Sequence, residues 1–122
     1  MSSVSSRWYE KAVQFGNMGR LKVAIHCCNR ALEANARDAD AWFYKGVTLD
    51  KLGRHQEGVT CYDRVIDINP FHAKAWFNKA ATLGNFGRYR EALACFEEAN
   101  RQGHPRAAQA AEECKEMLGF YK

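Results

Sequence analysis

Apolar residues recur with a helical period in the middle of the chain. Trp42, Gly46 and Leu49 stand at i, i+4 and i+7, so they share one face of a helix predicted from about Ala39 to Leu52. Gly53 follows directly and is expected to end that helix.

A second helix is predicted to begin near His55. Gly58, Tyr62 and Val65 repeat the same spacing along it. The sequence Asn69-Pro70 is expected to end it, because asparagine tolerates the left-handed conformation at a helix end and proline disfavours a continuing helix. The two stretches together predict a helical hairpin.

The hairpin pattern occurs three times with a period of 34 residues. The repeated positions include a tryptophan and a Gly-Arg pair: Trp8, Trp42 and Trp76, then Gly19-Arg20, Gly53-Arg54 and Gly87-Arg88. A hairpin of this size cannot bury both its faces, so about three stacked units are the practical minimum. We therefore predict three units at 5–38, 39–72 and 73–106, followed by a capping helix and tail at 107–122.

Small residues are predicted to let the two helices of each hairpin approach closely. The facing pairs are Ala12 with Ala24, Gly46 with Gly58, and Ala80 with Ala92. At the chain ends, Ser2, Ser3, Ser5 and Ser6 are N-cap candidates for the first helix. The segment from His104 to Leu118 carries Ala107, Ala111, Cys114 and Leu118 on one side and charged residues on the other, which predicts the capping helix.

These features resemble the tetratricopeptide repeat over essentially the whole chain. The resemblance implies an all-α, right-handed superhelical solenoid of three antiparallel hairpins, whose first helices line a concave groove that binds peptides or partner helices. Two departures stand out. Lys11, Lys45 and Lys79 occupy places where the family often has leucine, and we expect their aliphatic stems to lie on the core. The first copy ends in Asn35-Ala36 without proline, which predicts a looser connection to the second copy.

The implied groove carries an aromatic row and a small aliphatic row, flanked by polar groups, on the face of each first helix turned away from its own second helix. The candidate partner-binding residues are Tyr9, Val13, Asp40, Phe43, Tyr44, Val47, Lys74, Phe77, Asn78 and Ala81. An exposed apolar stripe of this kind usually marks an interaction site. An alternative interpretation is that the aromatic row mainly stiffens neighbouring helices.

The best-known grooves of the family grip a C-terminal carboxylate with lysine, asparagine and arginine at fixed places. In this chain those places hold Tyr9, Val13, Tyr44, Lys74 and Asn78, of which only Lys74 fits the pattern. Shifting the frame by one unit gives Phe43, Val47, Asn78, Ala108 and Glu112, where only Asn78 fits. We therefore expect an apolar or amphipathic protein segment as the ligand and not a chaperone tail.

Composition adds a few limits. The net charge is +4, with 18 basic and 14 acidic residues interspersed, and no apolar run approaches the roughly 18 residues of a membrane span. No secretory signal is readable, and five cysteines in a proline-poor chain favour free thiols in a reducing compartment. We predict a cytoplasmic chain without membrane contact, and the sequence suits an excised domain as well as a small whole protein.

Chemistry and other partners are the remaining alternatives. Cys27, Cys61 and Cys95 repeat at 34, too far apart for a shared zinc or a disulfide, and no acid, base and nucleophile converge on one surface. We predict no enzyme activity, no metal and no cofactor. Arg20, Arg54 and Arg88 form a basic ladder that we interpret as solvated turn residues, with nucleic-acid binding as the alternative. Self-association through the groove and the tail residues Phe120 and Tyr121 also stays open.

Overall fold

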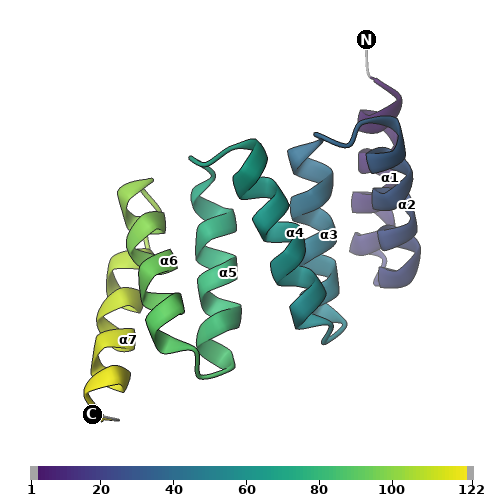
Figure 1. Ribbon diagram of the computed structural model, residues 1–122. Helices are drawn as coiled ribbons and strands as arrows, with labels where there is room; N and C mark the ends of the chain where they lie inside the picture. Colours follow the sequence, from purple (N-terminus) through teal and green to yellow (C-terminus); the bar gives the residue numbers. More distant parts are fainter. Residues whose placement is uncertain (1–2, 121–122) are drawn as a thin grey trace. The chain divides into compact units, whose positions relative to one another are not determined.

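The computed structural model describes the backbone of residues 3–120 and the side chains of residues 3–119 (Figure 1). In that range the chain forms seven α-helices and no strand. The helices are α1 (Val4–Asn17), α2 (Leu21–Ala34), α3 (Ala39–Lys51), α4 (His55–Ile68), α5 (Ala73–Asn85), α6 (Tyr89–Arg101) and α7 (Ala107–Phe120). The predicted all-α class is confirmed. The tail residue Tyr121 and the side chain of Phe120, on which the self-association alternative rested, lie outside this description.

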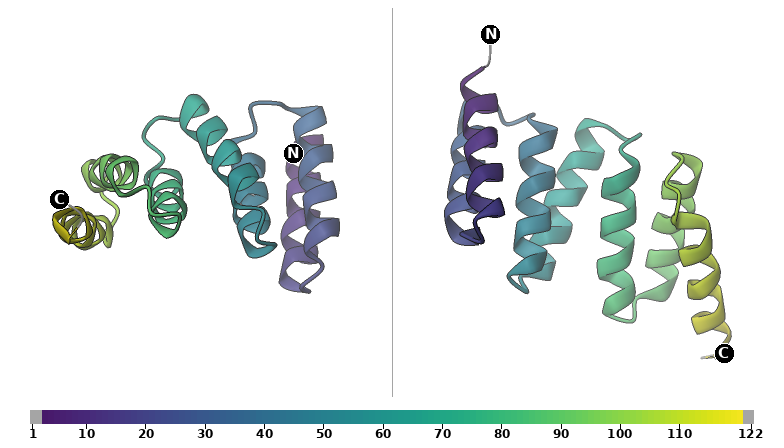
Figure 2. Two further views of the ribbon diagram at one scale, coloured as in Figure 1. Left: turned by 60° about the horizontal axis from the view of Figure 1, so that its bottom comes forward. Right: turned by 180° about the vertical axis from the view of Figure 1, so that it is seen from behind.

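Consecutive helices pair into hairpins. α1 packs on α2, α3 on α4 and α5 on α6, and α7 covers the open side of α6 (Figures 1 and 2). The chain divides into two compact units, residues 1–68 with α1–α4 and residues 69–122 with α5–α7. None of the described helices is both long and apolar enough to cross a lipid bilayer.

Glycines in the left-handed conformation end the first helix of each hairpin. Gly19, Gly53 and Gly87 have φ angles of 75°, 77° and 78°. The arginine that follows each glycine donates its backbone N–H to a carbonyl five residues back, as in Arg54 N to Leu49 O at 2.9 Å. A fourth such glycine, Gly103 at φ 89°, ends α6 before α7. These turns require glycine because a Cβ disfavours positive φ.

The second hairpin shows why small residues stand between its helices. A Cβ added to Gly58 would lie 3.2 Å from the Gly46 carbonyl oxygen and 2.8 Å from Asp50 Oδ1. One added to Gly46 would lie 2.6 Å from the Tyr62 ring. The predicted close approach of Gly46 and Gly58 is confirmed, and Ala12, Ala24, Ala80 and Ala92 are fully buried at the corresponding places.

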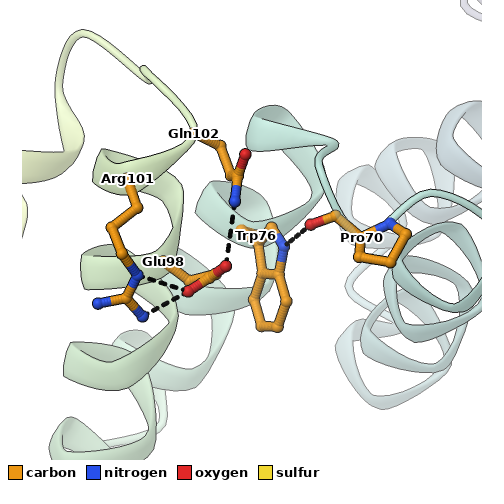
Figure 3. A network of polar contacts seen from close by, with 5 residues as sticks. All are labelled: Pro70, Trp76, Glu98, Arg101 and Gln102. Atoms are coloured by element: carbon orange, nitrogen blue, oxygen red, sulfur yellow. Dashed lines mark hydrogen bonds and ion pairs between the residues drawn. The ribbon is translucent and has the colours of Figure 1, made fainter.

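The connection from α2 to α3 makes the same kinds of hydrogen bond as residues 69–76, although it lacks proline. Asn35 Oδ1 accepts from Arg37 N at 3.1 Å, and Asn69 Oδ1 accepts from Phe71 N at 3.1 Å. The Trp42 indole N–H donates to Ala36 O at 2.9 Å. Trp76 donates in the same way to Pro70 O at 2.8 Å (Figure 3).

The predicted looseness between the first two copies is wrong, since α1–α4 form one compact unit. Ser5 gives a further reason. Its buried hydroxyl lies 3.1 Å from Ala31 O and also contacts the Asp38 carboxylate, while Asp38 caps α3 by accepting from Ala41 N at 3.0 Å. Of the serines proposed as N-caps, Ser3 caps α1 through Ser6 N at 3.0 Å, and Ser2 lies outside the described residues.

α7 is amphipathic as predicted. Ala107, Ala111 and Cys114 are buried, whereas Glu112, Glu113, Lys115 and Glu116 are exposed. The helix begins at Ala107, after a turn at residues 104–106 in which His104 Nδ1 accepts from Arg106 N at 3.2 Å. The cap therefore rests on α6 through small side chains.

Candidate functional site

The ten predicted partner-binding side chains all lie on first helices, and we call them the first-helix surface. Six belong to the first unit, on α1 and α3, and four belong to the second unit, on α5. Asp40 and Lys74 are exposed, and the other eight are half-buried. Half-buried apolar and aromatic side chains are able to touch a ligand while resting on the scaffold.

Tyr9 and Tyr44 are brought together in the first unit. Their ring centroids are 6.1 Å apart at an interplanar angle of 85°, an edge-to-face contact between α1 and α3. The Tyr44 hydroxyl occupies the space where Gly16 has no side chain, because a Cβ there would lie 1.9 Å from that oxygen. The role of Gly16 in admitting Tyr44 was missed by the sequence analysis.

Both tyrosines remain neutral at physiological pH. Burial raises the pKa of Tyr9 above its ordinary value, and Asp40 raises it further. Burial also raises the pKa of Tyr44. The two phenols therefore offer hydrogen-bonding groups, and Asp40 supplies negative charge beside them.

Phe43 lies closer to its own second helix than the sequence predicted. Its ring is 5.9 Å from that of Tyr62 on α4, tilted by 48°. Tyr62 is buried and donates from its hydroxyl to Asp50 Oδ2 at 2.5 Å, and His55 Nδ1 lies 3.0 Å from Asp50 Oδ1. This polar network was missed, because its members are spread over two helices, α3 and α4.

Phe77 is similarly enclosed in the second unit. Its ring is 5.3 Å from Phe96 on α6, and the His104 imidazole stacks on it at 3.9 Å with an interplanar angle of 4°. The Arg106 guanidinium lies 5.1 Å from the Phe77 centroid. Burial lowers the pKa of His104, and the positive charges of Arg106 and Lys74 lower it further.

A cavity of about 390 Å³ lies beside this cluster in the second unit. It is lined by Phe77, Pro105, Arg106, Gln109, Ala110 and Glu113. It reaches from α5 over the turn before α7 to α7 itself. Sequence reasoning gave Phe77 but missed His104 and Arg106, because neither residue type recurs at the equivalent places 34 and 68 residues earlier.

The three lysines at atypical places each lie over the tryptophan of their own hairpin. The ammonium-to-ring distances are 4.8 Å for Lys11 and Trp8, 5.4 Å for Lys45 and Trp42, and 6.0 Å for Lys79 and Trp76. Cation–π attraction therefore adds to any packing of the lysine stems.

Ion pairs reduce the charge of the arginine ladder. Arg54 donates to Glu57 from Nε at 2.5 Å and from a terminal nitrogen at 2.8 Å, and Arg88 pairs with Glu91 in the same way. Arg20 lies 5.4 Å from the Phe15 ring. In the second unit, Glu98 accepts from both Arg101 and Gln102 (Figure 3).

The five cysteines are buried, and none of them forms a disulfide bond. Burial raises the pKa of Cys28 to about 12 and that of Cys61 to about 11, so both stay protonated. Among the described residues no group of three or more His, Cys, Asp or Glu side chains is placed to hold a metal ion.

Comparison with known proteins gives a family and a fold. The family model described as anaphase-promoting complex, cyclosome, subunit 3, matches residues 17–99, which is more than half of the chain. No curated protein matches the chain in sequence.

Several solved structures share the fold. The first TPR of Spaghetti (RPAP3), bound to HSP90 peptide SRMEEVD, has a TM-score of 0.90 at 15% identity, covering 98% of this chain and 96% of that one. The Arabidopsis OM64 TPR domain has a TM-score of 0.86 at 18% identity, covering 93% and 95%. The Sgt2 TPR domain from Aspergillus fumigatus has a TM-score of 0.87 at 14% identity, covering 97% and 81%. At these identities the likeness is one of fold.

Proposed function

Since the chain belongs to the anaphase-promoting complex, cyclosome, subunit 3, family of tetratricopeptide-repeat proteins, we propose that it is a non-catalytic protein-binding module. The first-helix surface binds an extended peptide or a helix of a partner protein. Binding and not catalysis is the role, because the titratable groups beside this surface are engaged in ring stacking and hydrogen bonds within the fold.

The aromatic surface between α1 and α3 is the observation that carries the proposal. Tyr9, Val13, Tyr44 and Val47 are half-buried on the first helices of the first unit. Helical scaffolds recognise peptides through apolar anchors in such places, and an uncovered apolar surface costs solubility unless it has a use. Val13 and Val47 matter most here, because a solvated wall would carry polar side chains at those positions.

Each unit favours its own ligand chemistry. In the first unit Asp40 stands beside the aromatic pair, so apolar groups flanked by a basic or hydrogen-bond-donating group suit it. In the second unit Lys74, Arg106 and the stacked Phe77 favour an apolar group beside an acidic one. An amphipathic partner segment, which carries apolar and charged groups side by side, suits the first unit or the second.

The proposed ligand is not a chaperone C-terminal carboxylate. The Spaghetti domain shares the fold and was solved with an HSP90 peptide. Among the five places where such grooves carry their carboxylate-binding groups, this chain matches the pattern only at Lys74. We expect the peptide SRMEEVD to bind this chain with a Kd weaker than about 1 mM. Saturable binding at micromolar concentration in a calorimetric titration would refute that expectation.

A matched pair of valine substitutions tests the proposal itself. Val47→Glu places a charge in the first-helix surface, whereas Val4→Glu makes the same change at an exposed side chain near the start of α1. Proteins captured from native cell extract by the parent chain should be retained by Val4→Glu and lost with Val47→Glu. We expect at least about a tenfold loss of affinity, because the carboxylate would be desolvated against the ligand.

The control is the thermal unfolding of both variants. If Val47→Glu captures the same proteins as the parent, the first-helix surface is not the binding site. If it loses capture and unfolds far earlier than Val4→Glu, the residue belongs to the scaffold, and the aromatic surface loses its proposed role.

A further inference from the structure

A second pocket lies in the first unit, away from the first-helix surface. It has a volume of about 350 Å³ and is bounded by α2, α3, the turn after α3, and α4. None of the ten residues of the first-helix surface lines it. A ligand of this pocket would therefore be distinct from a ligand of the first-helix surface.

The floor of this pocket is apolar. Ile25, Leu49 and Cys61 are 9%, 2% and 3% exposed. The Trp42 indole forms one wall and is held in place by its hydrogen bond to Ala36 O at 2.9 Å. Because burial raises the pKa of Cys61 to about 11, its thiol is protonated and adds no charge. The floor suits one apolar side chain.

The rim of the pocket is positively charged. It carries Lys45, Arg54 and Arg64 against one carboxylate, Glu57. Glu57 is held by Arg54 through two hydrogen bonds of 2.5 and 2.8 Å. Lys45 lies over Trp42 at 5.4 Å. Because Glu57 is paired with Arg54, Lys45 and Arg64 supply the excess positive charge of the rim. Asn29 and Thr60 add polar groups at the same rim.

We propose that this pocket binds an acidic segment of a partner protein that inserts an apolar side chain. The side chain rests on Ile25, Leu49 and Trp42, and a flanking carboxylate lies between Lys45 and Arg64. The rim selects acidic over basic segments, because a basic segment would meet uncompensated positive charge. The pocket's volume of about 350 Å³ is at the low end for ligand sites and leaves room for an anchoring side chain with its flanking backbone.

The three tryptophans make the test specific. Only Trp42 lines the pocket, so the indole N–H resonances of Trp8 and Trp76 serve as internal references in a two-dimensional NMR spectrum. The probe is the end-capped peptide EEFEE, titrated to millimolar concentration into the full chain. We expect saturable movement of the Trp42 resonance and little movement of the other two.

Two control peptides separate the parts of the interaction. QQFQQ keeps the ring and lacks charge, and EEGEE keeps the charge and lacks the ring. Both should bind more weakly than EEFEE. The proposal is overturned if QQFQQ binds as well as EEFEE, or if Trp8 and Trp76 move as much as Trp42.

A matched pair of double variants tests the rim. Lys45→Gln with Arg64→Gln removes the two rim charges. Lys11→Gln with Arg30→Gln makes the same change at the equivalent places of the first hairpin, where both cations lie over Trp8 and outside the pocket. The first variant should weaken EEFEE binding by about fivefold and the second by less than about twofold.

Equal weakening by the two variants would show that only net charge matters and would overturn the proposal. The peptide comparison on the parent chain decides the question even if a double variant fails to fold. Because the pocket and the first-helix surface share no residue, Val47→Glu should leave EEFEE binding unchanged. The proposed function and the proposed pocket ligand are therefore tested separately.

Discussion

Tyr44 shows how a single residue links the scaffold to the proposed binding surface. Its ring meets Tyr9 edge-to-face, and its hydroxyl lies over Gly16 on α1. The aromatic surface of the first unit therefore depends on a glycine whose contribution is the absence of a side chain.

Gly16→Ala should lower the free energy of unfolding by about 1–3 kcal/mol, because the new methyl group would overlap the Tyr44 hydroxyl. Gly119→Ala is the control, since nothing lies within 4 Å of its added Cβ, and it should be neutral or slightly stabilising. Urea unfolding of both variants measures the difference. In a Tyr44→Phe background the cost of Gly16→Ala should shrink; an unchanged cost would mean that the two residues do not interact.

His104 should make the stability of the second unit depend on pH. Burial, Arg106 and Lys74 lower its pKa in the folded chain, so the unfolded chain takes up this proton at higher pH. The contribution to stability is fully present above the unfolded pKa of about 6.5 and is lost as the pH falls from there through the folded pKa. An NMR titration of the imidazole should give a pKa below that of an unfolded reference peptide. A raised value would contradict the stacked, partly desolvated environment on Phe77.

At the residue scale, the sequence pattern predicted the positions of the surface side chains but not their contacts. The aromatic and aliphatic positions of the first helices were predictable, because they recur every 34 residues. The partners of Phe43 and Phe77 were not, since contacts with Tyr62, Phe96 and His104 depend on how far each ring reaches across a hairpin. Non-periodic groups such as Asp50 and Arg106 leave no signal in a repeat.

Among the elements, the connection between α2 and α3 corrects the expectation drawn from its missing proline. The side-chain turn at Asn35 and the indole bond of Trp42 to Ala36 fix its path. Proline at the equivalent place, Pro70, therefore adds rigidity to a path that is already defined by other bonds.

Ala36→Pro should stabilise the chain by about 0.5–1 kcal/mol, because it restricts the unfolded chain at a position whose carbonyl, and not its N–H, is used in the fold. Asn35 is already extended, with φ −150° and ψ 98°, and so lies outside the α region that a following proline disfavours. Arg37→Pro is the matched control, since it removes the N–H that Asn35 accepts, and it should destabilise. Differential scanning calorimetry compares the two, and destabilisation by Ala36→Pro would indicate an incompatible backbone.

Helix positions were largely predictable from the hydrophobic period and from the glycine and proline residues that end helices. α3 ends one residue before the predicted Leu52, and α4 begins at His55 as expected. α7 begins at Ala107, because the turn at His104 takes up residues 104–106. A local bond overrides propensity at such a boundary.

At the scale of the whole molecule, the chain consists of two compact units with different charge near their proposed binding residues. The first presents Asp40 beside tyrosines, and the second presents Lys74 and Arg106 beside Phe77. The repeat explains the shared scaffold, and the non-repeated polar residues set the chemistry of each unit.

Nucleic acid should not bind appreciably. Arg54 and Arg88 are paired with glutamates, so the ladder lacks the free charge that phosphates require. We expect a Kd weaker than about 100 µM for a mixed-sequence duplex at physiological salt, measured by fluorescence anisotropy. Tighter binding that weakens steeply with added salt would restore the arginine ladder as a functional surface.

Mapping a bound partner segment by methyl NMR tests the central claim most directly. With valine methyl groups labelled and a captured partner's segment added, the resonances of Val13 and Val47 should shift saturably, while those of Val4 and the buried Val65 should not. Saturable binding that leaves Val13 and Val47 unmoved would contradict recognition through the first helices.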